Sequence, residues 1–371
     1  MEKPIRILMI NYKMQCAGIE SFIMNIYRNI DRNKVQFDFL VHYEERQFYD
    51  DEIEALGGKI YRLSIREDNN FIKYIKDLNK FFFNHPEYKI VHGHMESFGI
   101  FYLRAAYLAG IPYRIAHSHI AQKNKGLKGI VKNILNKGYK KYATDLFACS
   151  EDAGEFIFGK NTEFKVLKNA IDIDKFVYNE GVRKEVRNEL QIQDDTFVIG
   201  HVGRFNEQKN HKFLVDIFKA VEERKNNVLL LLIGDGNLKN SIENQVHQLG
   251  LDEKVKFLGV RSDVDRIYQA MDIFVMPSLF EGLPVSGIEA QAAGLPSIFS
   301  DRITEKTQII DAVSFLSLEN NIKNWQNKIL SYYKNYERQD EGNRIRNAGY
   351  DIKKQANELM QYYIKLASKG D

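Results

Sequence analysis

The sequence predicts an α/β protein with two domains, each built on a doubly wound parallel sheet. Short apolar runs typical of buried strands alternate with helical apolar spacing along the chain, which favours parallel strands joined by crossover helices. At 371 residues the chain is long for one domain, so two domains of roughly 170–190 residues are expected. The segment 168–172 separates the two sets of strands and is the expected linker.

Each half of the chain carries enough strand-like runs for one sheet. In the first half, the expected strands lie near 6–11, 37–41, 59–63, 90–94, 113–118 and 145–148. In the second half, they lie near 197–202, 228–233, 255–258, 273–276 and 297–300. The final segment, 352–367, has the apolar spacing of a helix.

Composition narrows the class of protein. The net charge is +3 with 28% charged residues, so the chain as a whole is not a polycation. Its two cysteines, Cys16 and Cys149, have no metal-ligand spacing and suit a reducing compartment. No apolar run approaches the ~20 residues of a membrane-spanning helix, and Arg6 interrupts the short apolar stretch at the N-terminus. We expect a cytoplasmic protein, attached at most peripherally to the inner face of the plasma membrane.

The segment 280–290 is the most informative part of the chain. It places Glu281 and Glu289 on either side of a turn rich in glycine and proline that runs into a helical pattern. The start of a helix offers unpaired N–H groups and the positive end of the helix dipole to an anion. Amides that hold phosphate, beside carboxylates that bind hydroxyls, suit a sugar nucleotide. The alternative is an ordinary strand–turn–helix joint with two solvated glutamates.

A second segment supports an anion site. Arg204 and Lys209 follow the buried strand expected at 197–202 and precede a helical pattern. Ligands of open α/β sheets bind outside the carboxyl ends of strands. An arginine fork and a lysine point charge can together neutralise a diphosphate there. A solvated basic loop is the alternative.

These segments resemble the family 4 glycosyltransferases of the GT-B fold, of the bacterial capsule and exopolysaccharide type. The matching pieces are Gly203-Arg204 with Lys209 five positions on, Gly234-Asp235-Gly236, Phe257-Leu258-Gly259, and Pro277-Ser278 before the two glutamates. The resemblance implies two Rossmann-like domains facing a cleft. Residues 1–170 would form the acceptor domain and 171–350 the nucleotide-sugar donor domain, with 351–371 a helix packing back on the first domain.

The resemblance also implies an activity. It indicates a retaining, metal-independent hexosyltransferase without a cofactor, which moves a sugar from a nucleotide-sugar to a glycan or lipid-linked acceptor in polysaccharide biosynthesis. Uridine diphosphate is the favoured carrier and guanosine diphosphate the alternative. A GT-B-type sugar-nucleotide epimerase and a non-catalytic partner subunit of a glycosyltransferase complex remain alternative functions.

By the same resemblance, Arg204 and Lys209 would stabilise the departing diphosphate, Glu281 would hold hydroxyls of the sugar, and Glu289 would hold the ribose. Further donor-binding residues would be Gly18, Gly203, Arg261, Leu283, Pro284, Val285 and Ser286. The family has a pair of glycines near Gly18, whereas this chain has Ala17 at one of the two positions.

Four histidines lie at the ends of two expected strands. His92 and His94 end one strand, and His117 and His119 end the next. If the strands are adjacent and parallel, both pairs reach one edge of the sheet. The resemblance implies one histidine that contacts the donor, and it favours His119 while leaving His117 open, with His94 a further cleft residue. Metal ligation is the alternative, but no cysteine or carboxylate set accompanies them.

The segment 123–141 carries seven lysines and no acidic residue, with apolar residues at helical spacing. A basic amphipathic helix is the pattern expected at an anionic bilayer surface. Nucleic acid is not the expected partner, because the segment lacks interleaved aromatic residues. The alternative is that the apolar residues pack inside the domain and the lysines are solvated.

Overall fold

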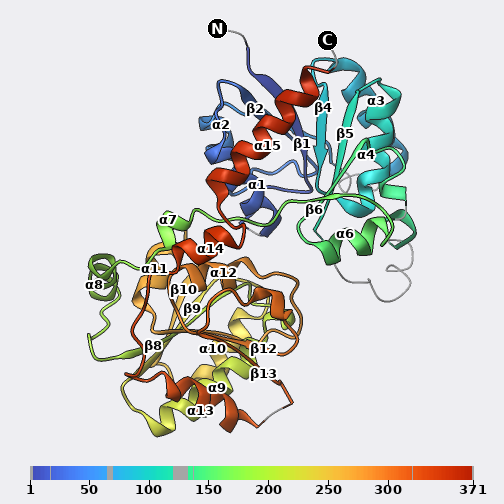
Figure 1. Ribbon diagram of the computed structural model, residues 1–371. Helices are drawn as coiled ribbons and strands as arrows, with labels where there is room; N and C mark the ends of the chain where they lie inside the picture. Colours follow the sequence, from blue (N-terminus) through green and yellow to red (C-terminus); the bar gives the residue numbers. More distant parts are fainter. Residues whose placement is uncertain are drawn as a thin grey trace. The chain divides into compact units, whose positions relative to one another are not determined.

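The computed structural model describes residues 3–16, 18–64, 70–119, 133–136, 138–319 and 321–369. The chain divides into two compact units, one of residues 1–171 with 351–371 and one of residues 172–350 (Figure 1). Each unit is an α/β domain on its own parallel sheet. The fold class expected from the sequence, two Rossmann-like domains with a C-terminal helix that belongs to the first, is confirmed.

The described residues of the first unit form seven parallel strands in the order β3-β2-β1-β4-β5-β6-β7. These strands are β1 (Ile5–Ile10), β2 (Val35–Val41), β3 (Ile60–Arg62), β4 (Ile90–Gly93), β5 (Tyr113–Ser118), β6 (Asp145–Ala148) and β7 (Lys165–Val166). Its named helices are α1 (Gly18–Asn29), α2 (Asp50–Ala55), α3 (Phe71–Asn84), α4 (Glu96–Leu108), α6 (Glu151–Phe158) and α15 (Ile352–Ala367).

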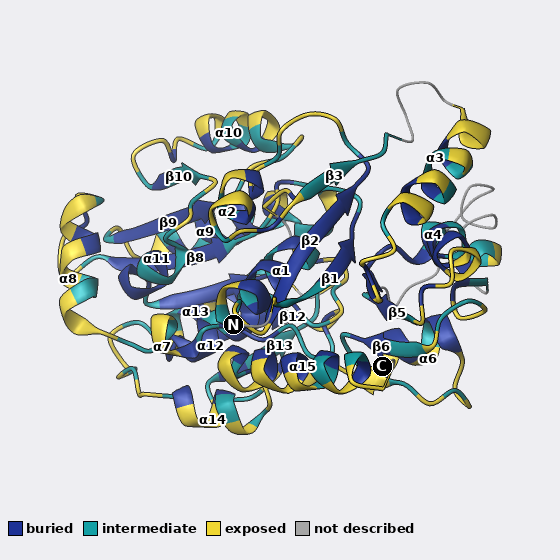
Figure 2. Cartoon of the chain, turned by 90° about the horizontal axis from the view of Figure 1, so that it is seen from above, coloured by how far each residue is buried: buried dark blue, intermediate teal, exposed yellow. Residues whose placement is uncertain are grey.

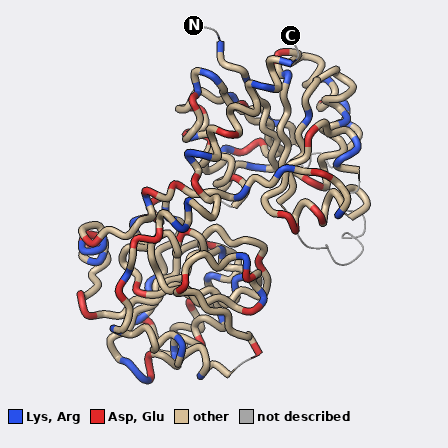
Figure 3. The backbone as a smooth tube through the Cα atoms, viewed as in Figure 1, with Lys and Arg blue, Asp and Glu red and all other residues tan. Residues whose placement is uncertain are grey.

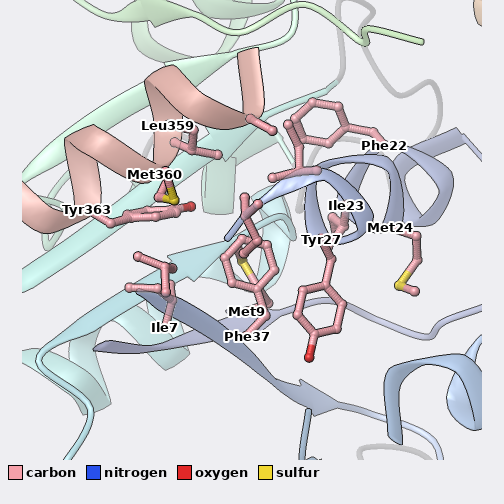
Figure 4. Close-up of a cluster of buried hydrophobic side chains, with 14 of the residues drawn as sticks. Ile7, Met9, Phe22, Ile23, Met24, Tyr27, Phe37, Leu359, Met360 and Tyr363 are labelled. Carbon is pink, nitrogen blue, oxygen red and sulfur yellow. The ribbon is translucent and has the colours of Figure 1, made fainter. Parts of the chain in front are cut away.

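Helices cover both faces of this sheet (Figure 2). On one face, apolar side chains of α1 and α15 pack on the strands, as Figure 4 shows for Phe22, Ile23, Leu359 and Met360. On the other face, α3, α4 and α6 do the same. The side chain of Asp351 accepts N–H groups of the first turn of α15 and so caps that helix. Burial of each large apolar side chain stabilises by about 1.5–3 kcal/mol, which holds α15 to the first unit.

In the second unit, six parallel strands are present among the residues that the structure describes, in the order β10-β9-β8-β11-β12-β13. These strands are β8 (Phe197–Val202), β9 (Val228–Ile233), β10 (Val255–Gly259), β11 (Ile273–Met276), β12 (Ser297–Ser300) and β13 (Val313–Leu316). Its helices are α7 (Ile173–Phe176), α8 (Glu180–Glu189), η1 (Glu207–Lys209), α9 (His211–Arg224), α10 (Lys239–Gln248), α11 (Val264–Ala270), α12 (Val285–Ala292), η2 (Glu305–Thr307), α13 (Ile322–Ser331) and α14 (Gly342–Asn347).

Both sheets reverse their strand order at one point. In the first sheet the chain winds outward from β1 in one direction and from β4 in the other, and in the second sheet it does so from β8 and β11. Loops at the carboxyl side of such a switch point form the ligand-binding crevice of doubly wound sheets. Each unit therefore has one edge where a ligand site is expected.

Charge and hydropathy add two facts. Lys and Arg are interspersed with Asp and Glu along both units (Figure 3), in keeping with the small net charge of +3. Within the described ranges, no helix combines the length and the apolar character that crossing a bilayer requires.

Candidate active site

The predicted site residues fall into two groups, one at the switch point of each sheet. In the second unit, β8 and β11 pair only at Ile199–Gly200 with Ile273–Phe274. Beyond this short pairing, the buried His201 on β8 lies with Nδ1 2.8 Å from the carbonyl oxygen of Val275 on β11. The imidazole donates there and fixes the distance between the two strands at the point where their loops leave the sheet.

The loops that follow β8 and β11 are bonded to each other. The Leu279 N–H donates to the Gln208 carbonyl at 2.8 Å, and the Asn210 side chain donates to the Pro277 carbonyl at 3.1 Å. These two bonds bring the basic loop and the two-glutamate segment, which lie about seventy positions apart in sequence, into one surface.

Two glycines make the first loop sterically feasible. A Cβ at Gly203 would lie 3.1 Å from the Cδ and Cε atoms of Lys209, so the glycine lets the lysine stem cross the backbone. Gly234 has φ +134°, and a Cβ there would lie 2.2 Å from the Gly203 carbonyl oxygen. Because neither residue has a Cβ, the backbones of Gly203 and Gly234 can lie this close together, and the loop passes over the end of β9.

Lys209 and Glu281 form an ion pair. The Lys209 Nζ lies 2.8 Å from the Glu281 Oε1, and the two side chains are only 15% and 10% exposed. The Asn206 side chain accepts the Lys209 backbone N–H at 3.1 Å and so fixes the turn that carries the lysine. Attraction between opposite charges strengthens as water is excluded. The Lys209–Glu281 pair is therefore the centre of the charged side chains at this edge of the sheet.

Arg204, on the loop after β8, is exposed to solvent. Within the part of the second unit that the structure describes, its guanidinium has no hydrogen-bond or ion-pair partner. An arginine beside a paired lysine is available to an anion, which it can bind as a fork.

The helix α12 (Val285–Ala292) begins directly after Pro284, within the segment where the sequence predicts a turn that runs into a helix. No side chain caps its N-terminus, so the N–H groups of its first residues, Val285 and Ser286, have no acceptor within the helix. Leu283 precedes them on the same turn. This end of the helix is thus a potential anion site of the kind that the sequence indicates.

Glu289 lies one turn into α12 and contacts a residue that sequence reasoning missed. The Tyr268 hydroxyl on α11 lies 3.0 Å from the Glu289 Oε2 and 3.0 Å from the Ser286 carbonyl oxygen. The glutamate as a whole is partly exposed, but protein packs around its carboxylate. This burial raises the pKa of Glu289 to about 7, against the opposing effect of the tyrosine hydrogen bond.

Arg261 follows β10 and is held by its own loop. Its Nε and Nη2 donate to the two carboxylate oxygens of Asp263 at 2.8 and 2.7 Å, an arrangement that raises the pKa of the guanidinium. The Gly234 N–H donates to the Gly259 carbonyl at 2.9 Å and joins this loop to the end of β9. The Arg261 guanidinium is therefore held in a fixed orientation by Asp263.

In the first unit, the four histidines at the strand ends form an array. The strands β4 and β5 are adjacent and parallel, with His92 paired to Ile115 in register. Across the strands, the His92 Nε2 lies 3.1 Å from the His117 Nδ1, and the His94 Nδ1 lies 2.9 Å from the His119 Nε2. Along the strands, ring centroids are 4.6 Å apart for His92 and His94 and 4.3 Å apart for His117 and His119. We call these four residues the histidine array.

The surroundings of the array keep it neutral. Phe22 of α1 packs edge-on against His94, His117 and His119. Burial lowers the pKa of His92 and of His119 to about 3 and places the pKa values of the other two well below the usual value. The His119 backbone N–H donates to the Glu96 Oε1 at 2.7 Å, which fixes the chain just past β5.

Nitrogen atoms of His92, His94 and His117 all lie within 4.8 Å of one another, so these residues could hold a metal ion. The rings of His92 and His94, however, stack nearly face to face, with centroids 4.6 Å apart and an interplanar angle of 16°. A metal ligand directs its lone pair in the ring plane toward a shared point about 2.0–2.1 Å away. Stacked rings do not converge in this way, and the array matches a hydrogen-bonded set better than a metal centre.

Gly18 is the first residue of α1 and lies one turn before Phe22. A Cβ at Gly18 would meet nothing within 4 Å, so packing within the first unit does not require a glycine there. Ala17, the departure from the family pattern, lies outside the described residues, as do 120–132 and 137 of the basic segment. Of the lysines that remain, Lys140 donates to the Phe158 carbonyl at 2.6 Å and thus secures the end of α6.

Comparison with known proteins assigns the family. Residues 182–351 match the family described as Glycosyl transferases group 1. The EpsF protein of Bacillus subtilis (strain 168) is 37% identical over 332 residues, which cover 87% of this chain and 86% of the relative. The chain belongs to the group 1 glycosyltransferases.

Two further proteins are similar to this glycosyltransferase. The UDP-Gal:alpha-D-GlcNAc-diphosphoundecaprenol alpha-1,3-galactosyltransferase of Escherichia coli is 32% identical over 252 residues, which cover 64% of this chain and 62% of that enzyme. The crystal structure of Anabaena Alr3699/HepE in complex with UDP and glucose superposes with a TM-score of 0.74 at 17% identity, covering 98% of this chain and 99% of that one. The second likeness shows a shared fold.

The family and the enzyme class that the sequence indicates are thereby confirmed. For this glycosyltransferase the structure adds two residues that sequence reasoning passed over, Tyr268 beside Glu289 and Tyr363 beside His92. Both lie within the apolar pattern of a helix, where an aromatic residue is expected to pack in the hydrophobic core. No local motif could have identified them.

Proposed function

We propose that this glycosyltransferase transfers a hexosyl group from a nucleoside-diphosphate sugar to a glycan or lipid-linked acceptor in polysaccharide biosynthesis, with retention of configuration and without a metal. UDP is the proposed carrier. The observation that carries the proposal is the Lys209–Glu281 pair, which lies at the switch point of the second sheet. One relative and one protein of the same fold support the carrier, since the Escherichia coli enzyme is named for UDP-Gal and the HepE structure holds UDP.

The second unit would bind the donor. Cations at Arg204 and Lys209, with the open N-terminus of α12, supply positive potential for a diphosphate. As the bond between the sugar and the diphosphate breaks, negative charge grows on the leaving phosphate oxygen, and preorganised cations stabilise that charge. Glu281 would take sugar hydroxyls and Glu289 the ribose hydroxyls, because a carboxylate accepts hydrogen bonds from hydroxyl groups.

Lys209 and Glu281 would change partners when the donor arrives. In this structure each neutralises the other at 2.8 Å. A diphosphate would draw the ammonium toward its oxygens, while the sugar hydroxyls would occupy the carboxylate. The pair thus keeps both groups in place before binding, at little cost in reorganisation afterwards.

The first unit would bind the acceptor. In this proposal His119 contacts the sugar or phosphate region as a neutral imidazole, since burial keeps its pKa far below 7. No residue is assigned as a covalent nucleophile. The acceptor hydroxyl would attack on the face that the diphosphate leaves, and its proton would pass to the leaving phosphate oxygen.

A peripheral membrane contact is part of the proposal. The Escherichia coli relative is named for a diphosphoundecaprenol-linked acceptor, which resides in a bilayer. On the first unit, Ile134 is 62% exposed, and Ile72 and Phe83 on α3 are 69% and 81% exposed. Lys76 and Lys80 share the exposed face of α3 with these two residues. Apolar side chains among lysines are suited to an anionic bilayer surface on the inner face of the plasma membrane.

Sedimentation with vesicles tests the contact. We expect the purified chain to bind vesicles that contain anionic lipid, because basic residues are attracted to a negative surface potential, and not neutral vesicles. Phe83→Ser with Lys76→Gln should weaken binding without unfolding the chain. Equal sedimentation of the wild type with neutral and anionic vesicles, or of variant and wild type, would refute the contact.

Thermal shift of the purified protein, with a chelator present, tests the donor assignment. A ligand that binds only the native state raises the apparent stability by mass action. We expect UDP and one or more UDP-sugars to raise the melting temperature, and GDP and ADP to leave it unchanged. A shift with GDP alone would replace the proposed carrier, and a shift that disappears with chelator would overturn metal independence of donor binding.

Product analysis separates transfer from epimerisation. Incubation of the donor without an acceptor should return the unchanged sugar nucleotide, apart from slow hydrolysis. Conversion to an epimeric sugar nucleotide would support the epimerase alternative and overturn the proposed transfer.

A further inference from the structure

The C-terminal helix reaches the histidine array through one hydroxyl. Tyr363 on α15 is fully buried, and its hydroxyl oxygen lies 2.6 Å from the His92 Nδ1. In Figure 4 the Tyr363 side chain extends from α15 toward the strands of the first sheet. Within the described part of the chain, His92 is the only hydrogen-bond partner of this hydroxyl.

The hydroxyl proton of Tyr363 determines which ring nitrogen of His92 carries a proton. A buried O–H without an acceptor costs about 1–3 kcal/mol, so Tyr363 donates its proton to the only acceptor that it meets, the His92 Nδ1. That nitrogen then carries no proton. Because burial keeps His92 neutral, its single ring proton is on Nε2.

The same argument extends one residue further. The His92 Nε2 lies 3.1 Å from the His117 Nδ1, so the His92 N–H donates there and the His117 Nδ1 is an acceptor. Burial keeps His117 neutral as well, and its proton is therefore on Nε2. This nitrogen is buried and has no partner among the described residues, so the chain of bonds ends in an unused N–H donor.

We propose that Tyr363 and His92 are positioning residues that set the tautomer of His117 and make its Nε2 a hydrogen-bond donor to an oxygen atom. The acceptor oxygen belongs to the substrate or to an ordered water that contacts it. The functional part of this inference rests on the proposed function, because it places the histidine array in the active site. His119 stacks on His117 with ring centroids 4.3 Å apart, so the ring that Tyr363 fixes also supports the ring proposed to contact the donor.

The other half of the array is not determined in this way. His94 and His119 share one hydrogen bond at 2.9 Å, but the His94 Nε2 and the His119 Nδ1 have no partner in the described ranges. Either tautomer pair satisfies that bond. The structure thus assigns a fixed tautomer to the pair that Tyr363 reaches and leaves the other pair free to follow a ligand, as which ring nitrogen carries the proton depends on the bond made by the other.

Nitrogen NMR of the full chain labelled with ¹⁵N-histidine tests the proposal directly. Two-bond ¹⁵N–¹H correlation spectra distinguish a protonated ring nitrogen from an unprotonated one, and single His→Gln variants assign the signals. At pH 7 we expect both His92 and His117 as the Nε2–H tautomer. A His117 that is protonated on Nδ1, or on both nitrogens, would overturn the proposal. A shift of the His92 and His117 signals on adding equimolar Zn²⁺ would replace it with a metal site.

Adjacent tyrosines provide a matched pair of variants. In Tyr363→Phe, His92 loses its donor, so we expect the Nε2–H population of His117 to fall and the other tautomer to appear. Tyr362→Phe removes a neighbouring hydroxyl that bonds Asp145 instead, with a similar loss of stability expected, and should leave the histidine signals unchanged. Identical histidine spectra in Tyr363→Phe and wild type, or equal changes in both variants, would contradict the assigned role.

Turnover links the tautomer to the proposed function. We expect Tyr363→Phe to lower kcat about tenfold, a modest share of what a positioned polar group contributes, with the donor KM within about twofold of wild type. An altered tautomer with unchanged kcat would overturn the positioning role. Because the spectra require neither donor nor acceptor, their outcome is independent of whether the protein transfers a sugar.

Discussion

At the switch point of the second sheet the loops carry charged side chains that meet solvent or each other, whereas at the switch point of the first sheet four imidazoles are neutral and enclosed. Lys209 and Glu281 form an ion pair beside the exposed Arg204. The histidine array instead carries four imidazoles whose pKa values burial holds far below 7. Two sheets whose strand order reverses in the same way thus place different kinds of polar side chain at equivalent edges.

The difference follows from the tasks that each edge can perform. Charge at the second unit can balance a diphosphate, and it costs little because these side chains retain contact with water or with each other. Neutral imidazoles at the first unit can donate or accept hydrogen bonds without adding a cation to an enclosed space, where an unpaired charge is costly. The second sheet therefore has an edge that can balance charge, and the first sheet has an edge that can form hydrogen bonds.

Removal of the ammonium from the charged edge should have the largest effect. We expect Lys209→Ala to lower kcat/KM by about 100–1,000-fold, roughly 3–4 kcal/mol, which is typical of a lost group that stabilises developing charge. Glu281 is left without its partner, so a small loss of melting temperature is expected too. Steady-state transfer assays with the preferred donor measure the effect.

Lys212→Ala is the control for that variant, because Lys212 is an exposed lysine three positions on, in the first turn of α9. It should retain wild-type activity. Near-normal turnover of a folded Lys209→Ala would remove Lys209 from the site and end the contrast between the two edges.

The neutral edge should show a smaller effect. We expect His119→Asn to lower kcat/KM by about 10–100-fold, since a lost neutral hydrogen bond is weaker than a lost charge interaction. The activity of the wild type should not follow a histidine titration between pH 5 and 8, because the pKa of His119 is about 3. A pH–rate profile and the variant assay at two donor concentrations measure both.

His85→Asn is the matched control, since His85 lies on the first unit at the end of α3 and pairs with Glu87 at 2.8 Å. It should behave as wild type. An acid limb near pH 6.5 that disappears in His119→Asn would show that the array titrates in the working range, contrary to the comparison.

The sequence predicts structural features that leave a pattern in neighbouring residues, and it does not predict features that depend on a partner distant in sequence. The main strands were placed to within one or two residues, because their apolar runs are buried whatever the partner strand. The short β7 and β13 were missed, since Lys165–Val166 is exposed and β13 is mostly half-buried, and a pairing partner distant in sequence leaves no local pattern.

The site shows the same limit. Gly203, Lys209 and the two glutamates are predicted as site residues because strand-end loops with glycine and charge have a recognisable spacing, and their roles stay a prediction. Their pairing across loops depends on β8 and β11 being neighbours, which only the strand order reveals. Tyr268 and Tyr363 each occupy a buried position on a helix, where the spacing fits a core residue, and their hydroxyl partners come from other elements.

Glu289 provides a test by stability. The folded pKa of about 7 exceeds the ordinary value of 4.5, so the folded state binds the proton more tightly than the unfolded state. Stability from this group is therefore lost as pH rises from about 4.5 through 7. Relative to wild type, Glu289→Gln should gain about 1–2 kcal/mol in unfolding free energy between pH 5 and 8, a value reduced for partial exposure.

The only tryptophan, Trp325, is buried in the second unit and reports its unfolding by fluorescence. Denaturant titrations at pH 5 and pH 8 then give the difference between variant and wild type. The exposed Glu253→Gln in the same unit serves as control and should show no such gain. A constant difference between Glu289→Gln and wild type across this range would show that the carboxylate is ionised throughout, like the rest of the charged edge.

The smallest expected effect comes from Tyr268→Phe. The hydroxyl stabilises the ionised Glu289 by a hydrogen bond at 3.0 Å, an interaction that lowers the pKa of the carboxyl against the larger effect of burial. Loss of this hydroxyl should raise the pKa of Glu289 further. Because the ionised carboxylate is the form proposed to accept the ribose hydroxyls, the increase of donor affinity with pH should move to higher pH, and donor binding at pH 7 should be a few-fold weaker. The donor KM between pH 6 and 9 measures the shift, and Tyr332→Phe, a tyrosine of the same unit outside this contact, should leave it unchanged. If Tyr268→Phe binds donor as wild type does at every pH, the protonation state of Glu289 has no part in donor binding, and the charged edge is limited to Arg204, Lys209 and Glu281.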